Sequence, residues 1–262
     1  MQWFSKQILV WADQERVTFT KEWAIQNLSV SDRAFEAASV RAIARGELLQ
    51  PRRGFYVIVS PLHFVAGAPP ALDVVDDLMS FESADYYVGL RKAAELFDVL
   101  DRSPSDFQII SSKRMKATQV GRARLLFYSR HGMPTKELVE RRSVTGGWIN
   151  ISKPALTAAD LIRYREGAGN NLFGLLFELG GLTDPGQLEL LSQSVPGPVL
   201  QRLGFAFDRI GQYELADDLF RLMDKGMRGV NWFGAVDRES ADAIFDKRWK
   251  VYCYRRELPK KD

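Results

Sequence analysis

The sequence is poor in the residues that build disulfides, metal centres and many catalytic sites. Among 262 residues there is one cysteine, Cys253, and two distant histidines, His63 and His131. A single cysteine excludes an internal disulfide and a cysteine-rich zinc site, and it fits a reducing, cytoplasmic environment. No HExxH, CxxC, nucleophile elbow or GxxxxGK[ST] phosphate loop occurs. These absences argue against an enzyme and against a bound metal or other cofactor.

The chain also lacks a long hydrophobic run and a strong excess of one charge. No uncharged apolar run approaches the ~18 residues that a membrane span needs, and the first residues do not resemble a secretion signal. The 36 basic and 33 acidic residues leave a net charge of only +3, so a nucleic-acid footprint must come from local clustering. The length and the 46% hydrophobic content are typical of a folded protein with two domains.

The first thirty residues predict two helices separated by a short strand. Apolar residues at helical spacing indicate an amphipathic helix over 3–13. A β-branched and aromatic run favours a strand over 16–20. Thr20 is then placed to cap a second helix that extends to Leu28.

A third helix is predicted over 32–45, with Ser31 as its N-cap. Phe35, Ala38 and Ala42 share one face, which is expected to pack on the earlier helices. The opposite face is expected to be open, and it carries Arg33, Ala37, Val40 and Arg41.

A β-hairpin with a basic tip is predicted to follow this helix. Two β-type runs, over 48–50 and 55–59, are joined by a tip that contains Arg52 and Arg53. Helices joined by a tight turn and followed by such a hairpin are typical of a winged helix-turn-helix, which places a helix in the major groove of duplex DNA. The first sixty residues therefore predict a DNA-binding domain.

Residues on the third helix and the hairpin are the candidate DNA contacts. Arg33, in the first turn of the helix, is the candidate for reading a base edge. Asp32 and Glu36 repel phosphate and receive no DNA role. The residues predicted to hold phosphates are Lys21, Ser31, Arg41, Arg52 and Arg53. Because the open face is rich in alanine, shape readout or a second surface is expected to add specificity.

The order of these features resembles the AbiEi antitoxins of type IV (AbiE) toxin–antitoxin systems. The similar N-terminal segments are Val17-Thr-Phe-Thr-Lys-Glu-Trp, Leu28-Ser-Val-Ser, Ala42-Ile-Ala-Arg-Gly-Glu-Leu-Leu and Pro51-Arg-Arg-Gly-Phe-Tyr. Further along, Tyr86-Tyr-Val-Gly-Leu-Arg-Lys-Ala-Ala-Glu-Leu-Phe looks like the helix that opens the family's second domain. The strands Phe107-Gln-Ile-Ile and Ala123-Arg-Leu-Leu-Phe-Tyr and the closing segment Lys247-Arg-Trp-Lys-Val-Tyr are also similar.

This resemblance implies a transcriptional repressor that binds inverted repeats in its own promoter. It also implies an antitoxin that counteracts a partner toxin of the nucleotidyltransferase-like class, directly or indirectly, through the second domain. A stand-alone regulator without a toxin, and a protein-interaction module, remain alternatives.

The remainder of the chain predicts an α+β protein with a domain boundary near residue 70. Residues 1–70 form the winged helix-turn-helix, and residues 71–262 form a mixed α/β domain that contains a helical bundle from about residue 157. An acidic segment over 73–85 is expected to face away from DNA. A second basic surface, either a nucleic-acid or toxin contact or a solvated sheet face, is predicted at Lys113, Arg114, Lys116, Arg122 and Arg124.

A metal-dependent nuclease is a further alternative, because acidic side chains and a lysine near the predicted strands are the minimum that such a site needs. Asp106 and Lys113 are available for this role. Metal-binding carboxylates are also available on the predicted helices, at Glu178, Asp184, Asp217 and Asp218, although surface charges explain them more simply.

Overall fold

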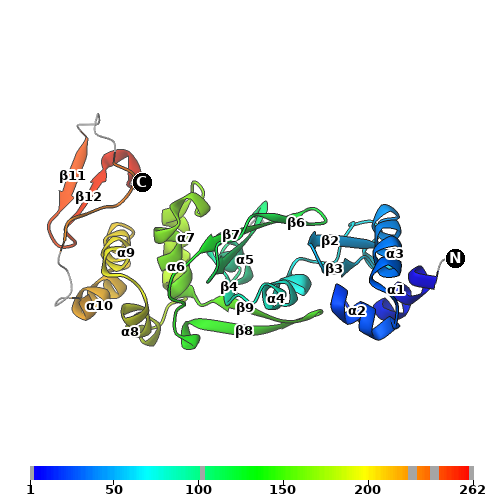
Figure 1. Ribbon diagram of the computed structural model, residues 1–262. Helices are drawn as coiled ribbons and strands as arrows, with labels where there is room; N and C mark the ends of the chain where they lie inside the picture. Colours follow the sequence, from blue (N-terminus) through cyan, green and yellow to red (C-terminus); the bar gives the residue numbers. More distant parts are fainter. Residues whose placement is uncertain (1–2, 101–103, 224–228, 237–241, 260–262) are drawn as a thin grey trace. The chain divides into compact units, whose positions relative to one another are not determined.

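The computed structural model describes residues 3–100, 104–223, 229–236 and 242–259, which belong to two compact units (Figure 1). Unit 1 comprises Met1–Tyr87, Ser105–His131 and Arg141–Asn150, and unit 2 comprises Val88–Pro104, Gly132–Glu140 and Ile151–Asp262. The architecture is mixed α and β, as expected. All of residues 1–70 fall in unit 1 together with later segments, so a division at residue 70 does not coincide with the boundary of this unit.

Unit 1 begins with three helices and a small antiparallel sheet of strand order β1-β3-β2. We call these residues, Trp3 to Ile58, the N-terminal module. The predicted helices, strand and hairpin are all present, and their bounds are α1 Trp3–Asp13, β1 Thr18–Thr20, α2 Lys21–Leu28, α3 Asp32–Ala44, β2 Leu48–Arg52 and β3 Phe55–Ile58.

Local side-chain chemistry sets where these helices begin and end. Thr20 Oγ1 accepts a hydrogen bond from Trp23 N at 3.1 Å, and Ser31 Oγ accepts one from Ala34 N at 3.3 Å. Both residues therefore cap their helices, as the sequence predicted. Gly46 follows α3 with φ +73°, a left-handed conformation that glycine adopts without steric cost.

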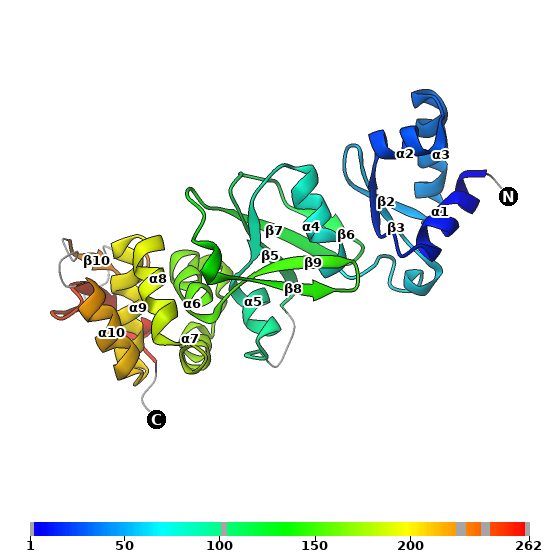
Figure 2. The same cartoon turned by 90° about the horizontal axis from the view of Figure 1, so that it is seen from below.

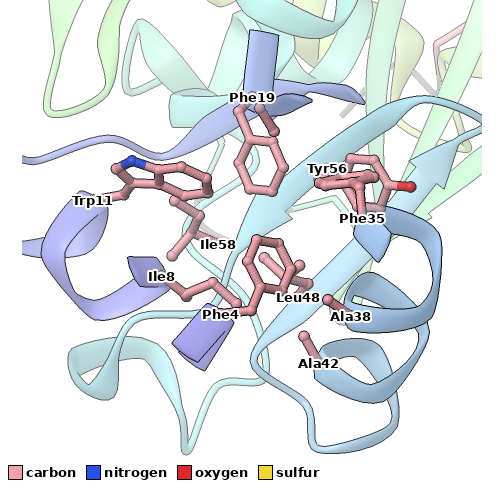
Figure 3. Close-up of a cluster of buried hydrophobic side chains, with 11 residues drawn as sticks. Phe4, Ile8, Trp11, Phe19, Phe35, Ala38, Ala42, Leu48, Tyr56 and Ile58 are labelled. Atoms are coloured by element: carbon pink, nitrogen blue, oxygen red, sulfur yellow. The ribbon is translucent and has the colours of Figure 1, made fainter. Parts of the chain in front are cut away.

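The core of the N-terminal module is aromatic (Figure 3). Rings from α1 and from β1 and β3 meet the buried face of α3, and Phe19 stacks on Tyr56 with ring centroids 5.2 Å apart. Phe35 and Ala42 are fully buried and Ala38 is 3% exposed, as their spacing predicted. Burial of one face of α3 fixes which of its residues remain open to a partner.

The remainder of unit 1 contains a short helix and most of a six-stranded sheet, of order β6-β7-β5-β4-β9-β8 (Figure 2). β5 and β7 pair in parallel, and β6 pairs with β7 in the antiparallel sense. The residue boundaries between unit 1 and unit 2 fall within β4, β8 and β9. The bounds are η1 Pro61–His63, α4 Leu72–Phe81, β4 Tyr86–Val88, β5 Asp106–Ser111, β6 Thr118–Val120, β7 Ala123–Ser129, β8 Val139–Val144 and β9 Gly147–Ser152.

The expectation of a continuous helix from Tyr86 was wrong for its first residues. Tyr86–Val88 forms strand β4, which is buried, and Val88 lies opposite Ile151. The helix α5 begins only at Leu90, after Gly89 in an extended conformation. Two tyrosines and a valine fit a buried strand better than a helix, because aromatic and β-branched side chains lose rotamer freedom against a helical turn.

Unit 2 is mainly helical, and helices α6 to α10 pack on one another as the expected bundle. A second small sheet of order β10-β12-β11 lies at the end of the chain. The bounds are α5 Leu90–Leu96, η2 Lys136–Leu138, α6 Pro154–Arg163, η3 Arg165–Gly167, α7 Leu172–Gly181, α8 Pro185–Ser194, α9 Gly197–Arg209, α10 Tyr213–Met223, β10 Asn231–Trp232, β11 Ala243–Asp246, β12 Val251–Tyr254 and η4 Arg255–Glu257.

Within the described residues, no helix combines the length and the apolar character that crossing a lipid bilayer requires. The same residues contain no group of three histidine, cysteine or carboxylate side chains close enough to hold a metal ion.

Candidate nucleic-acid interface

The open face of α3 carries the residues that the sequence assigned to it. Arg33, Ala37 and Arg41 are exposed, and Val40 is 65% exposed. An aliphatic side chain this open on a helix of a packed module marks a face that the module itself does not cover. The small side chains between the two arginines would allow another molecule to approach the helix closely.

Lys21 ties α2 to the beginning of α3. Its ammonium lies 2.6 Å from a carboxylate oxygen of Asp32 and 2.7 Å from one of Glu36. These hydrogen bonds raise the pKa of Lys21, so the side chain stays charged. The two carboxylates would otherwise repel a phosphate backbone at this helix end. Lys21, predicted as a phosphate contact, is thus occupied in offsetting that negative charge.

The turn of the hairpin lies beside the beginning of α2. Arg52 is opposite Phe55, so only Arg53 and Gly54 form the turn, and Gly54 has φ +86°. Lys21 N donates to Gly54 O at 2.8 Å. Through Lys21, the exposed Arg53 and the first turn of α3 therefore belong to the same end of the N-terminal module.

Arg52 lies within β2 and faces other parts of unit 1. Its Nε donates to Glu82 Oε1 at 2.9 Å, and its Nη2 donates to Lys116 O at 2.6 Å. Only about a fifth of the side chain is exposed. The predicted role of Arg52 as a phosphate contact is therefore less well supported than that of Arg53. Because Glu82 lies thirty residues away in the sequence, no local sequence pattern could predict its ion pair with Arg52.

Part of the predicted second basic surface lies next to this hairpin. Lys113 Nζ donates to Glu82 O at 2.7 Å, and Thr118 Oγ1 donates to Pro51 O at 2.9 Å. The side chains of Arg114, Lys116 and Arg122 are exposed. Arg124 is exposed as well, but its guanidinium lies 3.7 Å from Asp106, which offsets part of its charge.

The acidic segment makes hydrogen bonds within unit 1. Asp73 Oδ1 accepts from Gly146 N at 2.9 Å, Asp76 Oδ1 accepts from Tyr86 Oη at 2.7 Å, and Asp77 accepts from Thr18 Oγ1. With Glu82 held by Arg52, these carboxylates join parts of the unit together. The same residues account for much of the negative charge on α4.

A hydrogen-bonded network at the other end of α3 was not predicted from the sequence. Arg45 Nε and Nη2 donate to the two carboxylate oxygens of Glu47, both at 2.9 Å, and Nη2 also donates to Ser5 Oγ at 2.8 Å. The hydrogen bonds from Arg45 lower the pKa of Glu47. The network borders a largely apolar groove of about 820 Å³, which is further lined by Ile8, Leu9, Val59, Pro61, Phe64 and Val65.

The residues considered for a nuclease do not converge. Asp106 begins β5 and Lys113 follows its end, so about 20 Å of extended strand separates them. On the helices, Asp184 caps α8 by accepting from Gln187 N at 2.9 Å. Asp217 is paired with Arg248 and Asp218 with Arg221. Helix capping and ion pairing therefore account for the positions of these three carboxylates.

Comparison with known proteins supports the resemblance to the antitoxin family. Residues 87–208 match the sequence model of the AbiEi antitoxin C-terminal domain. The fold is similar to the crystal structure of the RV2827C protein from Mycobacterium tuberculosis, with a TM-score of 0.69 and 20% sequence identity, covering 98% of this chain and 92% of that one. A search among curated proteins gave no significant match. The match over residues 87–208 therefore supports the predicted resemblance to the AbiEi antitoxins.

Proposed function

We propose that the chain is a DNA-binding transcriptional repressor whose N-terminal module is a winged helix-turn-helix. The observation that carries the proposal is the placement of Arg33 and Arg53 at the same end of the module, on an open helix face and on a hairpin turn. In this geometry α3 enters the major groove and the turn lies along the backbone. The aromatic core behind α3 holds that helix rigidly for docking.

The interface assigns different tasks to its residues. Arg33, in the first turn of α3, is the residue we propose to contact a base edge. Arg41, Arg53 and the cap Ser31 contact phosphates, and Lys21 offsets part of the negative charge of Asp32 and Glu36. Lys113, Arg114 and Lys116 extend the positive charge beside the hairpin.

The family match supports the second half of the proposal, an antitoxin that counteracts a nucleotidyltransferase-like toxin. Such a pair would be encoded together, and the repressor would bind inverted repeats in its own promoter, in the cytoplasm. The alternative is a regulator without a toxin partner, which could have the same N-terminal module and the same antitoxin-like domain.

Titration of the full chain on duplexes from its own promoter region tests DNA binding. Arg33→Ala is expected to lose about 1 to 3 kcal/mol on the preferred sequence and less on random duplex, because only a base contact distinguishes the two. Arg53→Ala is expected to weaken both duplexes to the same extent.

Arg221→Ala serves as the matched control, since it removes one positive charge from a side chain that is 75% exposed on α10 of unit 2. Equal losses on promoter and random DNA for Arg33→Ala would remove that residue from base reading. Wild-type affinity in both Arg33→Ala and Arg53→Ala would reject the N-terminal module as the DNA-binding surface.

Co-expression with the neighbouring gene tests the antitoxin activity separately. Growth arrest that the full chain relieves supports the proposal, and relief by Arg33→Ala would show that antitoxicity does not require promoter binding. Growth arrest that persists in the presence of the full chain would contradict the antitoxin role.

A further inference from the structure

The outward face of α3 carries a stripe of aliphatic side chains. Ala37, Val40 and Ala44 are exposed and recur at intervals of three and four residues, so they lie on one face of the helix. The buried residues Phe35 and Ala42 lie on the opposite face. Val40 has the largest side chain of the stripe and is 65% exposed. The alanines on either side of it leave room for a ligand to reach its methyl groups.

Positive charge flanks Val40 along the helix. Arg33 precedes it by about two helical turns and Arg41 follows it directly. Both arginines are exposed, and neither guanidinium is paired with a carboxylate of the described residues. Glu36, one turn before Val40, is held by Lys21 at 2.7 Å. An apolar contact between cations is what a helix needs in the major groove, where base edges lie between two rows of phosphates.

The chemistry of valine limits which base it can recognise. Its side chain has no hydrogen-bond donor or acceptor, so it cannot pair with the polar groups of a base edge. The apolar group that the major groove presents is the C5 methyl of thymine. Contact between this methyl and those of Val40 removes both from water, whereas a polar base edge at the same place would lose water without a replacement. Val40 therefore favours thymine.

We propose that Val40 is a specificity-determining residue that contacts the C5 methyl of a thymine in the preferred duplex. The inference rests on the proposed DNA binding and adds which kind of base the sequence must contain. Val40 lies seven residues after Arg33, which is about 10.5 Å along the helix and about three base pairs along a duplex. The thymine is thus expected about three base pairs from the base that Arg33 reads.

The test compares the preferred promoter duplex with a copy in which deoxyuridine replaces every thymidine. Uracil pairs as thymine does but lacks the C5 methyl. In titrations by fluorescence anisotropy, the wild type is expected to bind the uracil duplex roughly fourfold more weakly, the factor that one buried methylene-sized group supplies. Val40→Ala is expected to show a similar loss on the thymine duplex and no further loss on the uracil duplex, because both changes remove the same contact.

Val10→Ala is the matched control, since it truncates a valine that is 46% exposed on α1 of the same module. This variant is expected to keep the wild-type preference for the thymine duplex. Circular dichroism checks that both variants fold, as expected for exposed positions. Single uracil substitutions then locate the methyl, and the sensitive position is expected about three base pairs from the one at which Arg33→Ala relaxes sequence choice.

Equal affinity of the wild type for the two duplexes would overturn the proposal and leave the proposed DNA binding intact. A loss on the uracil duplex that is as large in Val40→Ala as in the wild type would also overturn it, since the methyl would then act through another residue or through the shape of the duplex. Failure of the proposed function would look different. The thymine duplex would then not bind, or Arg33→Ala and Arg53→Ala would both keep wild-type affinity, and this inference would fall with it.

Discussion

Single residues in this protein often serve to offset charge at the candidate interface. Lys21 is the clearest case, since its ammonium is shared by Asp32 and Glu36 at the helix end that we propose to meet DNA. A carboxylate pair without that lysine would oppose the approach of phosphates. From the sequence, Lys21 was predicted to contact phosphate. Its ion pairs with Asp32 and Glu36 could not be predicted, because these carboxylates lie on another helix.

The ion pair of Arg45 and Glu47 predicts a pH-dependent contribution to stability. The pKa of Glu47 in the folded chain lies below its ordinary value of 4.5. The pair therefore stabilises the fold fully above that value, and its contribution is lost as the pH falls through the lower, folded pKa. Glu47→Gln is expected to lower the unfolding midpoint by roughly 1 to 3 °C at pH 7.

Thermal unfolding of both proteins at several pH values checks this prediction. The difference between the wild type and Glu47→Gln should shrink below pH 4.5. The exposed Glu22 supplies a matched control, Glu22→Gln, for which we expect little change. A difference that stays constant down to acidic pH would mean that Glu47 stabilises the chain by packing alone.

The hairpin of β2 and β3 is held at its base by other elements of unit 1. Arg52 bridges to Glu82, which follows α4, and to the carbonyl of Lys116, which precedes β6. Phe55 packs on Phe81 with ring centroids 5.4 Å apart. The hairpin therefore presents Arg53 from a fixed base, which reduces the entropy lost when a ligand is bound.

Two substitutions distinguish a structural role of Arg52 from a DNA contact. If Arg52 supports the hairpin, Arg52→Ala and Glu82→Gln should both lower stability, by roughly 1 kcal/mol, and should both speed amide hydrogen exchange in β2 and β3. Denaturant unfolding and exchange measured by mass spectrometry provide the readouts. Glu178→Gln, on the exposed surface of α7, is the control of equal charge change.

A phosphate-binding Arg52 would give a different pattern. Glu82→Gln would then release the guanidinium and raise DNA affinity, while Arg52→Ala would lower it. Opposite effects of the two variants on duplex binding would therefore contradict the supporting role.

The sequence was informative wherever a short-range rule decides the structure. The spacing of Phe35, Ala38 and Ala42 predicted the buried face of α3, and Ser31 predicted where that helix begins. Contacts between distant segments could not be predicted, because the partner of Arg52 lies thirty residues away. The sequence predicts a helix over residues 86–88, because their assignment to strand β4 depends on pairing with a distant strand.

At the scale of the whole molecule, the small net charge of +3 makes local clusters decide nucleic-acid binding. We expect the logarithm of the duplex affinity to fall linearly with the logarithm of the salt concentration, by about 0.9 for each neutralised phosphate. Arg53→Ala should reduce that slope by about 0.9, whereas Arg221→Ala should leave it unchanged. A slope unaffected by Arg53→Ala would show that this arginine touches no phosphate.

The hydrogen bonds from Thr118 to Pro51 and from Arg52 to Lys116 place the outermost strand of one sheet against the outermost strand of the other. Unshielded strands of this kind recruit other chains and promote aggregation. Dividing the chain near residue 70 would therefore give two aggregation-prone fragments. A truncated protein for biophysical work should contain both β2 and β6.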